Sequence, residues 1–494
     1  MKLSKYLSLI PLVAVAMLML QACYKDKGDY DYKDLNKVTL GDTSGLEYSV
    51  LQFDTLKLSP DIYASQDVPI TRYKFDWTAR AIDATVASQH FDTVQLSKDY
   101  LFNKQVSLPA GDYRLIFTVT DTATAVSSYL WYTLHVGSNY SRGWMFVEQF
   151  ANGGDISILA PTGKVFHNIY ESSNGVKLPK TLHRVDMNIR MSPKEVFLLS
   201  DDQGVEVNVT SFVNIGGFAK WFFNVPATQK PGRNHLVSNT AGQAGVLINN
   251  GLIHVKRYGG FPGPYLYGSE LTLDNKVEYS AAPYIMDGDF NSSRYIAAFY
   301  DNMGKRFIGL RSDAVGIGGN VVHFPTFVAG DAFDANNVGM TLQHAGPSPA
   351  NYIHSAILKD AAGDSYLFQL NLGVAASPRL KQKMNATGIA NMTAAANSVL
   401  LEYIYYAEGN RIRMYEIGPN AESLIYTLPA GETVTAMCID PAISTSTLMV
   451  GTYDGTTGRV YEFTLNVNGK FTGDTYVNKY EGFGKIVNMK YKIQ

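Results

Sequence analysis

The feature that most constrains the fold is a hairpin-like segment that recurs about every fifty residues through the C-terminal two-thirds of the chain. Each copy has an apolar run, a turn rich in Gly, Asn or Asp, and a second apolar run. Asn249-Asn250-Gly251 and Asp454-Gly455 are two such turns. These residues tolerate the positive φ angles that tight hairpins require. The segments that follow this pattern are Trp144–Leu159, Val196–Val209, Val246–Tyr258, Tyr295–Leu310, Ile353–Leu372, Glu402–Ile417 and Thr447–Leu465.

A single hairpin cannot bury its own apolar face, whereas a closed ring of four-stranded blades can. We therefore predict that residues 139–494 form a seven-bladed β-propeller. Six or eight blades, a second sandwich and a β-helix are the alternatives. The last segment, Lys485–Ile493, alternates as a strand and is predicted to close the ring by pairing near Trp144. The Ala-rich stretch Ala390–Leu400 predicts a short helical interruption.

A smaller β domain is predicted over residues 37–138, ahead of the ring. Apolar and polar residues alternate through Tyr73–Trp77, Tyr113–Val119 and Leu130–Val136, which is the period of half-buried strands. About a hundred residues of short strands favour an immunoglobulin-like β-sandwich. The whole chain is therefore expected to be all-β.

The N-terminus carries the features of an exported protein. Lys2 and Lys5 precede an apolar run, Leu7–Leu20, whose helix would span about 21 Å and is too short for a hydrocarbon core of about 30 Å. Residues 1–22 are therefore predicted to be a signal peptide. The run ends in Leu20-Gln21-Ala22-Cys23, which resembles the bacterial lipobox and implies cleavage before Cys23 and its acylation. Residues 23–36 then form a lipidated, polar tether, with a plain cleaved signal as the alternative.

Several of these segments resemble a known family. Gly111–Asp121 resembles the G-x-Y-x-V-x-L-x-V-T-D signature of PKD domains, and Tyr73–Trp77 resembles their Y-x-W-x-F strand. The residues from Cys23 onward look like the start of the PKD-like lipoproteins of Bacteroidetes, and Asp26 and Asp29 resemble their surface-export signal. The resemblance implies an outer-membrane protein beside nutrient importers of the SusC/SusD type. Trp77 and Tyr113 are expected to be core residues first.

Composition and motifs exclude several other functions. The formal net charge is -2, which does not indicate the strongly basic surface of a nucleic-acid-binding protein. The chain has no phosphate-binding loop, no H-E-x-x-H zinc motif and no complete nucleophile elbow, so neither a catalytic motif nor a cofactor or metal site is predicted. Cys438 lies in an apolar run and is expected to be a buried structural thiol.

The candidate binding residues are aromatic. Phe261, Tyr265 and Tyr267 lie in a stiff Gly- and Pro-rich stretch, and Trp221 begins the cluster Trp221-Phe222-Phe223. Exposed aromatics on stiff loops bind well because little side-chain entropy is lost. Packing between blades is the alternative for both groups.

The expected function is that of a lipid-anchored, non-enzymatic protein at the cell surface that binds glycan or peptide, with the periplasmic face of the outer membrane as the alternative location. A propeller hydrolase or lyase acting on an extracellular polymer is one alternative function. A structural module that docks other surface proteins is the other.

Overall fold

The computed structural model describes residues 34–493, apart from 53, 83–92, 109, 138–139, 141, 189–193, 239–242, 259–264, 290–294, 312–319 and 374–376. The predicted signal peptide, Cys23 and Phe261 therefore lie outside the described residues. The chain divides into two compact units: Met1–Val106 with Gly111–Val136, and Ser107–Ala110 with Gly137–Gln494.

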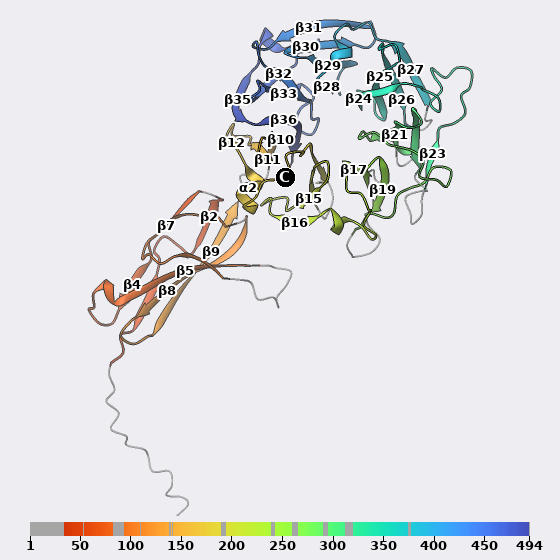
Figure 1. Cartoon of the computed structure of the whole chain (residues 1–494). Coiled ribbons are helices and arrows are strands. Elements are labelled where there is room, and N and C mark those ends of the chain that lie inside the picture. Colours follow the sequence, from red (N-terminus) through yellow and green to blue (C-terminus); the bar gives the residue numbers. More distant parts are fainter. Residues whose placement is uncertain are drawn as a thin grey trace, which may run out of the picture. The chain divides into compact units, whose positions relative to one another are not determined.

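The first unit is a β-sandwich (Figure 1). Its main sheet has five strands in the order β2-β9-β8-β5-β6. Two separate two-stranded sheets, β1-β4 and β3-β7, complete the unit. The 3-10 helix η1 (Ile70–Arg72) precedes β5. The strands are β1 (Val38–Gly41), β2 (Glu47–Leu51), β3 (Thr55–Leu58), β4 (Asp61–Ala64), β5 (Tyr73–Ala81), β6 (Val94–Ser97), β7 (Phe102–Gln105), β8 (Gly111–Asp121) and β9 (Ser127–Gly137).

The sandwich core follows the predicted alternation. On β8, Tyr113, Leu115, Phe117 and Val119 are buried, while the residues between them are not. Trp77 of β5 is fully buried, and its ring lies 4.5 Å from that of Phe117, centroid to centroid. The prediction that Trp77 and Tyr113 are core residues is confirmed.

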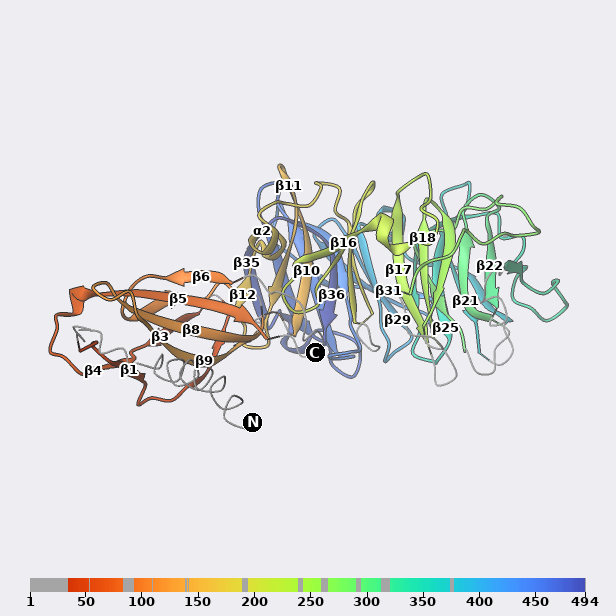
Figure 2. The same cartoon turned by 90° about the horizontal axis from the view of Figure 1, so that it is seen from below.

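The second unit is the predicted ring of blades (Figures 1 and 2). Among the described residues it contains seven antiparallel sheets, and each sequence hairpin supplies the second and third strands of one sheet, counted from the innermost strand. Blade 1 joins β36 (Lys485–Lys492) to β10 (Gly143–Phe150), β11 (Gly153–Leu159) and β12 (Val165–Phe166). Blade 2 is β13 (Arg184–Asn188), β14 (Glu195–Leu199), β15 (Gly204–Val207) and β16 (Asn214–Gly217). Blade 3 is β17 (Pro231–Ser238), β18 (Gln243–Asn249) and β19 (Leu252–Arg257).

The remaining four blades have four strands each. Blade 4 is β20 (Met286–Asp287), β21 (Tyr295–Asp301), β22 (Arg306–Arg311) and β23 (Val321–His323). Blade 5 is β24 (Thr341–Pro347), β25 (Ile353–Lys359), β26 (Ser365–Asn371) and β27 (Ser377–Lys383). Blade 6 is β28 (Ala394–Asn397), β29 (Tyr403–Glu408), β30 (Arg411–Glu416) and β31 (Ala421–Thr427). Blade 7 is β32 (Thr433–Cys438), β33 (Thr447–Tyr453), β34 (Gly458–Thr464) and β35 (Asn478–Phe483).

Helices in the ring are short. They are α2 (Ile169–Asn174) and the 3-10 turns η2 (Phe218–Trp221), η4 (Ile389–Asn391) and η5 (Thr472–Asp474). Within the described part of the chain, no helix combines the length and apolar character that a membrane crossing needs. The fold is thus all-β: an N-terminal sandwich followed by a seven-bladed propeller.

The last strand closes the ring, as predicted. β36 pairs antiparallel with β10 from Gly143 opposite Lys492 to Gln149 opposite Lys485. It also contacts the innermost strands of both neighbouring blades, β13 and β32. Because the first blade takes its inner strand from the end of the chain, the ring completes only when both ends of the domain have folded.

The predicted helix at Ala390–Leu400 is wrong. This stretch contains the short turn η4 and then β28, the innermost strand of blade 6 in Figure 1. Alanine has the highest intrinsic helix propensity, but strand pairing outweighs such local preferences, and β28 pairs with β29 here. Small residues suit this place because neighbouring inner strands approach closely. A Cβ on Gly346 of β24 would lie 2.9 Å from the side chain of Asn397.

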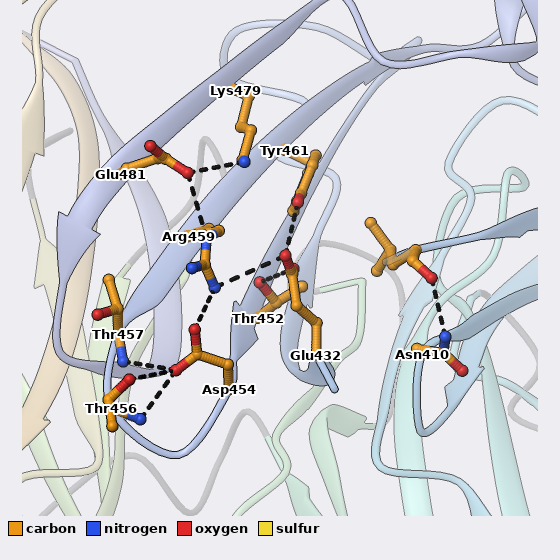
Figure 3. A network of polar contacts seen from close by, with 11 residues as sticks. Asn410, Glu432, Thr452, Asp454, Thr456, Thr457, Arg459, Tyr461, Lys479 and Glu481 are labelled. Carbon is orange, nitrogen blue, oxygen red and sulfur yellow. Dashed lines mark hydrogen bonds and ion pairs between the residues drawn. The ribbon is translucent and has the colours of Figure 1, made fainter. Parts of the chain in front are cut away.

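A buried carboxylate organises the interior of blade 7 (Figure 3). The Glu432 carboxylate accepts hydrogen bonds from the hydroxyls of Thr452, at 2.7 Å, and Tyr461, at 3.0 Å. Arg459 lies 3.6 Å from the same carboxylate and 2.7 Å from Asp454. The Asp454 carboxylate in turn accepts hydrogen bonds from backbone N–H groups of the β33–β34 turn. These hydrogen bonds hold the pKa of Asp454 well below the usual range. This network fixes the hairpin from inside the blade.

Candidate ligand site on the rim of the ring

A cavity of about 310 Å³ lies where blades 2, 3 and 4 meet, on the face where their innermost strands begin. The β14–β15 turn of blade 2 and the β18–β19 turn of blade 3 reach the same face, because adjacent strands are antiparallel. We call this space the rim cavity. It is lined by His183, Arg184, Asp201, Lys230, Pro231, Gly232, Ile248, Asn250, Gly251, Ser280, Ala281 and Pro283.

Two cations of the rim cavity keep donors available. Lys230 is exposed and makes no ion pair with a described residue. The closest carboxylate to Arg184 is Asp186, at 3.9 Å from Nη1. The Nε atom of Arg184 is buried and has no hydrogen-bond partner among the described residues.

Asp186 is held mainly by other groups. Its Oδ1 lies 3.2 Å from Arg233 Nη1, and its Oδ2 accepts the backbone N–H of Asn234 at 2.7 Å. Burial raises the pKa of Asp186, and the charge of Arg184 is the main effect that opposes this rise, although its Nη1 at 3.9 Å lies beyond hydrogen-bond distance.

The remaining polar side chains of the cavity include a histidine beside a carboxylate. His183 Nδ1 lies 3.5 Å from Asp201 Oδ1 and 3.3 Å from the carbonyl oxygen of Thr181. Burial lowers the pKa of His183, so its ring is neutral near pH 7. A neutral imidazole and an exposed carboxylate together offer both a donor and acceptors to a hydroxyl-rich ligand.

A second charged group lies on the innermost strands of blades 3 and 4. His235 Nε2 of β17 is 2.7 Å from Asp287 Oδ1 of β20, and His354 of β25 contacts the backbone carbonyl of Asp287 at 2.8 Å. Burial opposes the charged form of His235, yet Asp287 raises the pKa of this imidazole overall. Burial likewise opposes charge on Asp287, and His235 lowers its pKa.

The His235–Asp287 pair belongs to a series of contacts that join successive blades. Asp440 accepts the backbone N–H of Tyr491 at 3.0 Å, and Asn488 accepts that of Val185 at 3.1 Å. Asp186 accepts the N–H of Asn234 in the same way. Side chains near other inner strands also link neighbouring blades. The His235–Asp287 pair is therefore explained by a structural role, without any catalytic function.

The predicted aromatic platform is corrected by the structure. Trp221 and Tyr267 are buried with relative exposures of 3% and 0%, in an apolar cluster between blades 2 and 3. Neither ring therefore offers a face to a ligand. Tyr265 is half-buried, and its ring lies 5.2 Å from that of Tyr258. Phe261 lies outside the described residues, so its predicted role remains a prediction.

Tyr267 is buried because it helps to enclose a charged side chain. Lys256 is 4% exposed, and its Nζ lies 2.6 Å from Glu195 Oε1. The rings of Tyr267, Tyr258 and Phe197 lie 4.8 to 5.1 Å from the same Nζ. These aromatics solvate a buried ammonium rather than a ligand.

Cys438 is partly buried on the innermost strand of blade 7. Burial raises the pKa of its thiol to about 12, and nearby Asp440 adds to the rise. The thiol is therefore protonated at neutral pH, which fits the expected structural role and not that of a nucleophile. In the described ranges, no cluster of three or more His, Cys, Asp or Glu side chains is arranged to hold a metal ion.

The sequence alone did not indicate the rim cavity. His183, Arg184 and Lys230 lie outside every motif that we singled out. They come from two blades, and Ser280 comes from a third. Their only common signal is that each lies at or shortly before the start of the innermost strand of its blade.

The N-terminal part of the chain matches a known family. Residues 23–181 match the model of the PKD-like family. The match begins at Cys23, covers the sandwich, and continues through β10–β12 of blade 1 and helix α2. It supports the resemblance drawn from Gly111–Asp121 and extends it into the ring. No curated protein matches the chain.

The chain is similar to solved structures at low sequence identity. A quinonprotein alcohol dehydrogenase-like protein from Bacteroides thetaiotaomicron is 10% identical, with a TM-score of 0.53 over 92% of this chain and 99% of that one. A functionally unknown protein from Desulfotomaculum acetoxidans is 11% identical, with a TM-score of 0.37 over 71% of this chain and 98% of that one. The likeness to the first shows the fold alone.

Proposed function

We propose that this chain is a lipid-anchored binding protein of the outer membrane, displayed at the cell surface, which holds a segment of glycan or peptide in the rim cavity. The observation that carries the proposal is the cavity itself. Three successive blades bring cations, a carboxylate, a neutral histidine and small apolar surfaces together around about 310 Å³. Concave sites that combine apolar walls with a few polar groups are typical of ligand binding.

The anchor rests on the N-terminal sequence. The run that ends in Ala22-Cys23 resembles a lipobox, and the PKD-like match begins at the same cysteine. Such a protein would work as an accessory to nutrient importers of the SusC/SusD type. We expect Cys23→Ala to move the protein from the detergent phase to the aqueous phase in a detergent-partition assay. Unchanged partitioning would rule out the lipid anchor. Digestion by added protease in intact cells separates surface display from the periplasmic face.

A ligand array tests the binding function. The purified full chain, in detergent, is applied to arrays of glycans and peptides and compared with two tryptophan variants of one turn. Asp201 lines the rim cavity, and its neighbour Asp202 does not, although both are exposed. We expect Asp201→Trp to block retention and Asp202→Trp to leave it unchanged. An equal effect of both variants, or retention unaffected by either, would contradict binding in the rim cavity.

A propeller hydrolase or lyase is the second candidate, favoured by the His235–Asp287 pair. A carboxylate-oriented imidazole is a common general base. We expect this candidate to yield new reducing ends or unsaturated sugars from an extracellular polysaccharide, and His235→Gln to abolish them. A polymer that binds but is never cleaved would support the binding protein instead.

A further inference from the structure

We infer that the rim cavity is selective for a uronic acid unit, a sugar ring that carries a carboxylate; this rests on the proposed binding function and names its ligand class. The first reason is charge. Lys230 has no ion-pair partner among the described residues, and Arg184 lines the cavity with its nearest carboxylate, Asp186, 3.9 Å away. The single carboxylate in the lining, Asp201, is exposed and lies beside His183.

Arg184 is not held at hydrogen-bond distance by Asp186, the carboxylate nearest to it. Asp186 receives an N–H donor at 2.7 Å and the guanidinium of Arg233 at 3.2 Å, whereas Arg184 remains 3.9 Å away. The Arg184 side chain is 19% exposed and lines the cavity, so a ligand carboxylate would pair with its guanidinium from the cavity. Guanidinium groups bind carboxylates with two parallel hydrogen bonds, which also fixes the orientation of the ligand.

The second reason is the mixture of the other lining groups. Asp201 accepts hydrogen bonds from hydroxyls, and the neutral His183 both donates and accepts. Pro231, Pro283 and Ile248 give small apolar surfaces against which the C–H face of a sugar packs. An acidic peptide would also offer a carboxylate, but it would not use the hydroxyl-binding groups. The volume lies at the small end of the range for ligand pockets, about 300 to 1,000 Å³, and suits a single ring.

The test is calorimetric binding to the purified full chain in detergent. The probes are trigalacturonic acid, the neutral trisaccharide maltotriose, and a triglutamate peptide. We expect the uronate to bind, to bind more weakly as salt is added, and to be favoured over maltotriose.

Two substitutions make the test specific. Lys230→Gln should weaken trigalacturonic acid binding by about three- to tenfold. Lys220→Gln, at an exposed lysine of η2 outside the lining, is the matched control and should have no effect. Arg184→Gln should weaken the same binding at least as much. Thermal unfolding of each variant checks that the ring is intact.

The possible outcomes are distinct. Weaker uronate binding in Lys230→Gln and Arg184→Gln, with Lys220→Gln unchanged, supports the inference. Equal binding of maltotriose and trigalacturonic acid, or no effect of Lys230→Gln, overturns the uronate selectivity and leaves the binding function standing. Binding of triglutamate without the uronate also overturns the inference, in favour of a peptide. No retention of any glycan or peptide on the array would instead contradict the proposed function itself.

Discussion

Tyr491, in the last strand of the chain, lies directly opposite Trp144 in the first strand of the ring, and their rings meet edge to face with centroids 5.5 Å apart. Both side chains are buried, at 4% and 6% exposure. The pair thus joins the two ends of the propeller within blade 1. Arg142 adds a hydrogen bond from Nε to the Tyr491 hydroxyl at 3.0 Å.

Tyr491→Ala should therefore destabilise the ring strongly. Removal of a large buried aromatic side chain costs about 3 to 5 kcal/mol of unfolding free energy. Lys485→Ala, at an exposed residue of the same strand, should change the free energy of unfolding by less than about 0.5 kcal/mol. Urea unfolding followed by tryptophan fluorescence measures both. A Tyr491→Ala protein as stable as the control would show that β36 does not hold the ring closed.

Gly204→Ala should destabilise the contact between blades 2 and 3. A Cβ at this position would lie 2.3 Å from Cη2 of the buried Trp221. Overpacking of this kind costs about 1 to 3 kcal/mol. Gly217, on the paired strand β16, is the matched control. A Cβ on Gly217 would have no heavy atom closer than 3.9 Å. Thermal unfolding should therefore separate Gly204→Ala from Gly217→Ala, and equal melting temperatures would contradict the tight packing.

The stability of the sandwich should fall in acid through Asp121. Arg72 Nε lies 2.7 Å from Asp121 Oδ1. The hydrogen bond from this guanidinium is the main reason that the pKa of Asp121 falls from 3.8 to about 2. A carboxyl whose pKa is lower in the folded state stabilises that state above pH 3.8, and this contribution disappears as the pH falls toward 2.

Asp121→Asn should accordingly be less stable than the wild type at pH 7 and should lose less stability between pH 4 and pH 2. The matched control is Asp67→Asn, at an exposed carboxylate of the same unit. Urea unfolding at a series of pH values gives the comparison. Parallel pH profiles for the wild type and Asp121→Asn would show that the Arg72–Asp121 contact does not contribute.

Blade 7 should depend on the Glu432 carboxylate. Glu432→Ala leaves the Thr452 hydroxyl buried without its acceptor and removes the partner of Tyr461, which should cost about 2 to 4 kcal/mol. Glu432→Gln keeps one acceptor oxygen and should cost less. Hydrogen exchange of the β33–β34 amides measures the local effect (Figure 3). Protection that is equal in all three proteins would exclude the network as the support of this hairpin.

The strands were predictable because their signals are local. Alternation through Tyr113–Val119 fixed the buried face of β8, and turns such as Asn249-Asn250-Gly251 marked the middle hairpins of the blades. The closing strand was predictable for the same reason. The helix predicted for Ala390–Leu400 was wrong because alanines favour a helix locally. The pairing of β28 with β29 depends instead on the rest of the blade.

The amino-acid sequence by itself determined the all-β class, the repeat of hairpins and the closure of the ring, because period-2 patterns and turn residues act within a few positions of one another. Only the tertiary structure decided that the Tyr267 ring packs against the buried ammonium of Lys256. It alone also placed Arg184 and Lys230 in one cavity. Burial and charge balance arise between blades, from residues that are far apart in the chain until the ring brings them together.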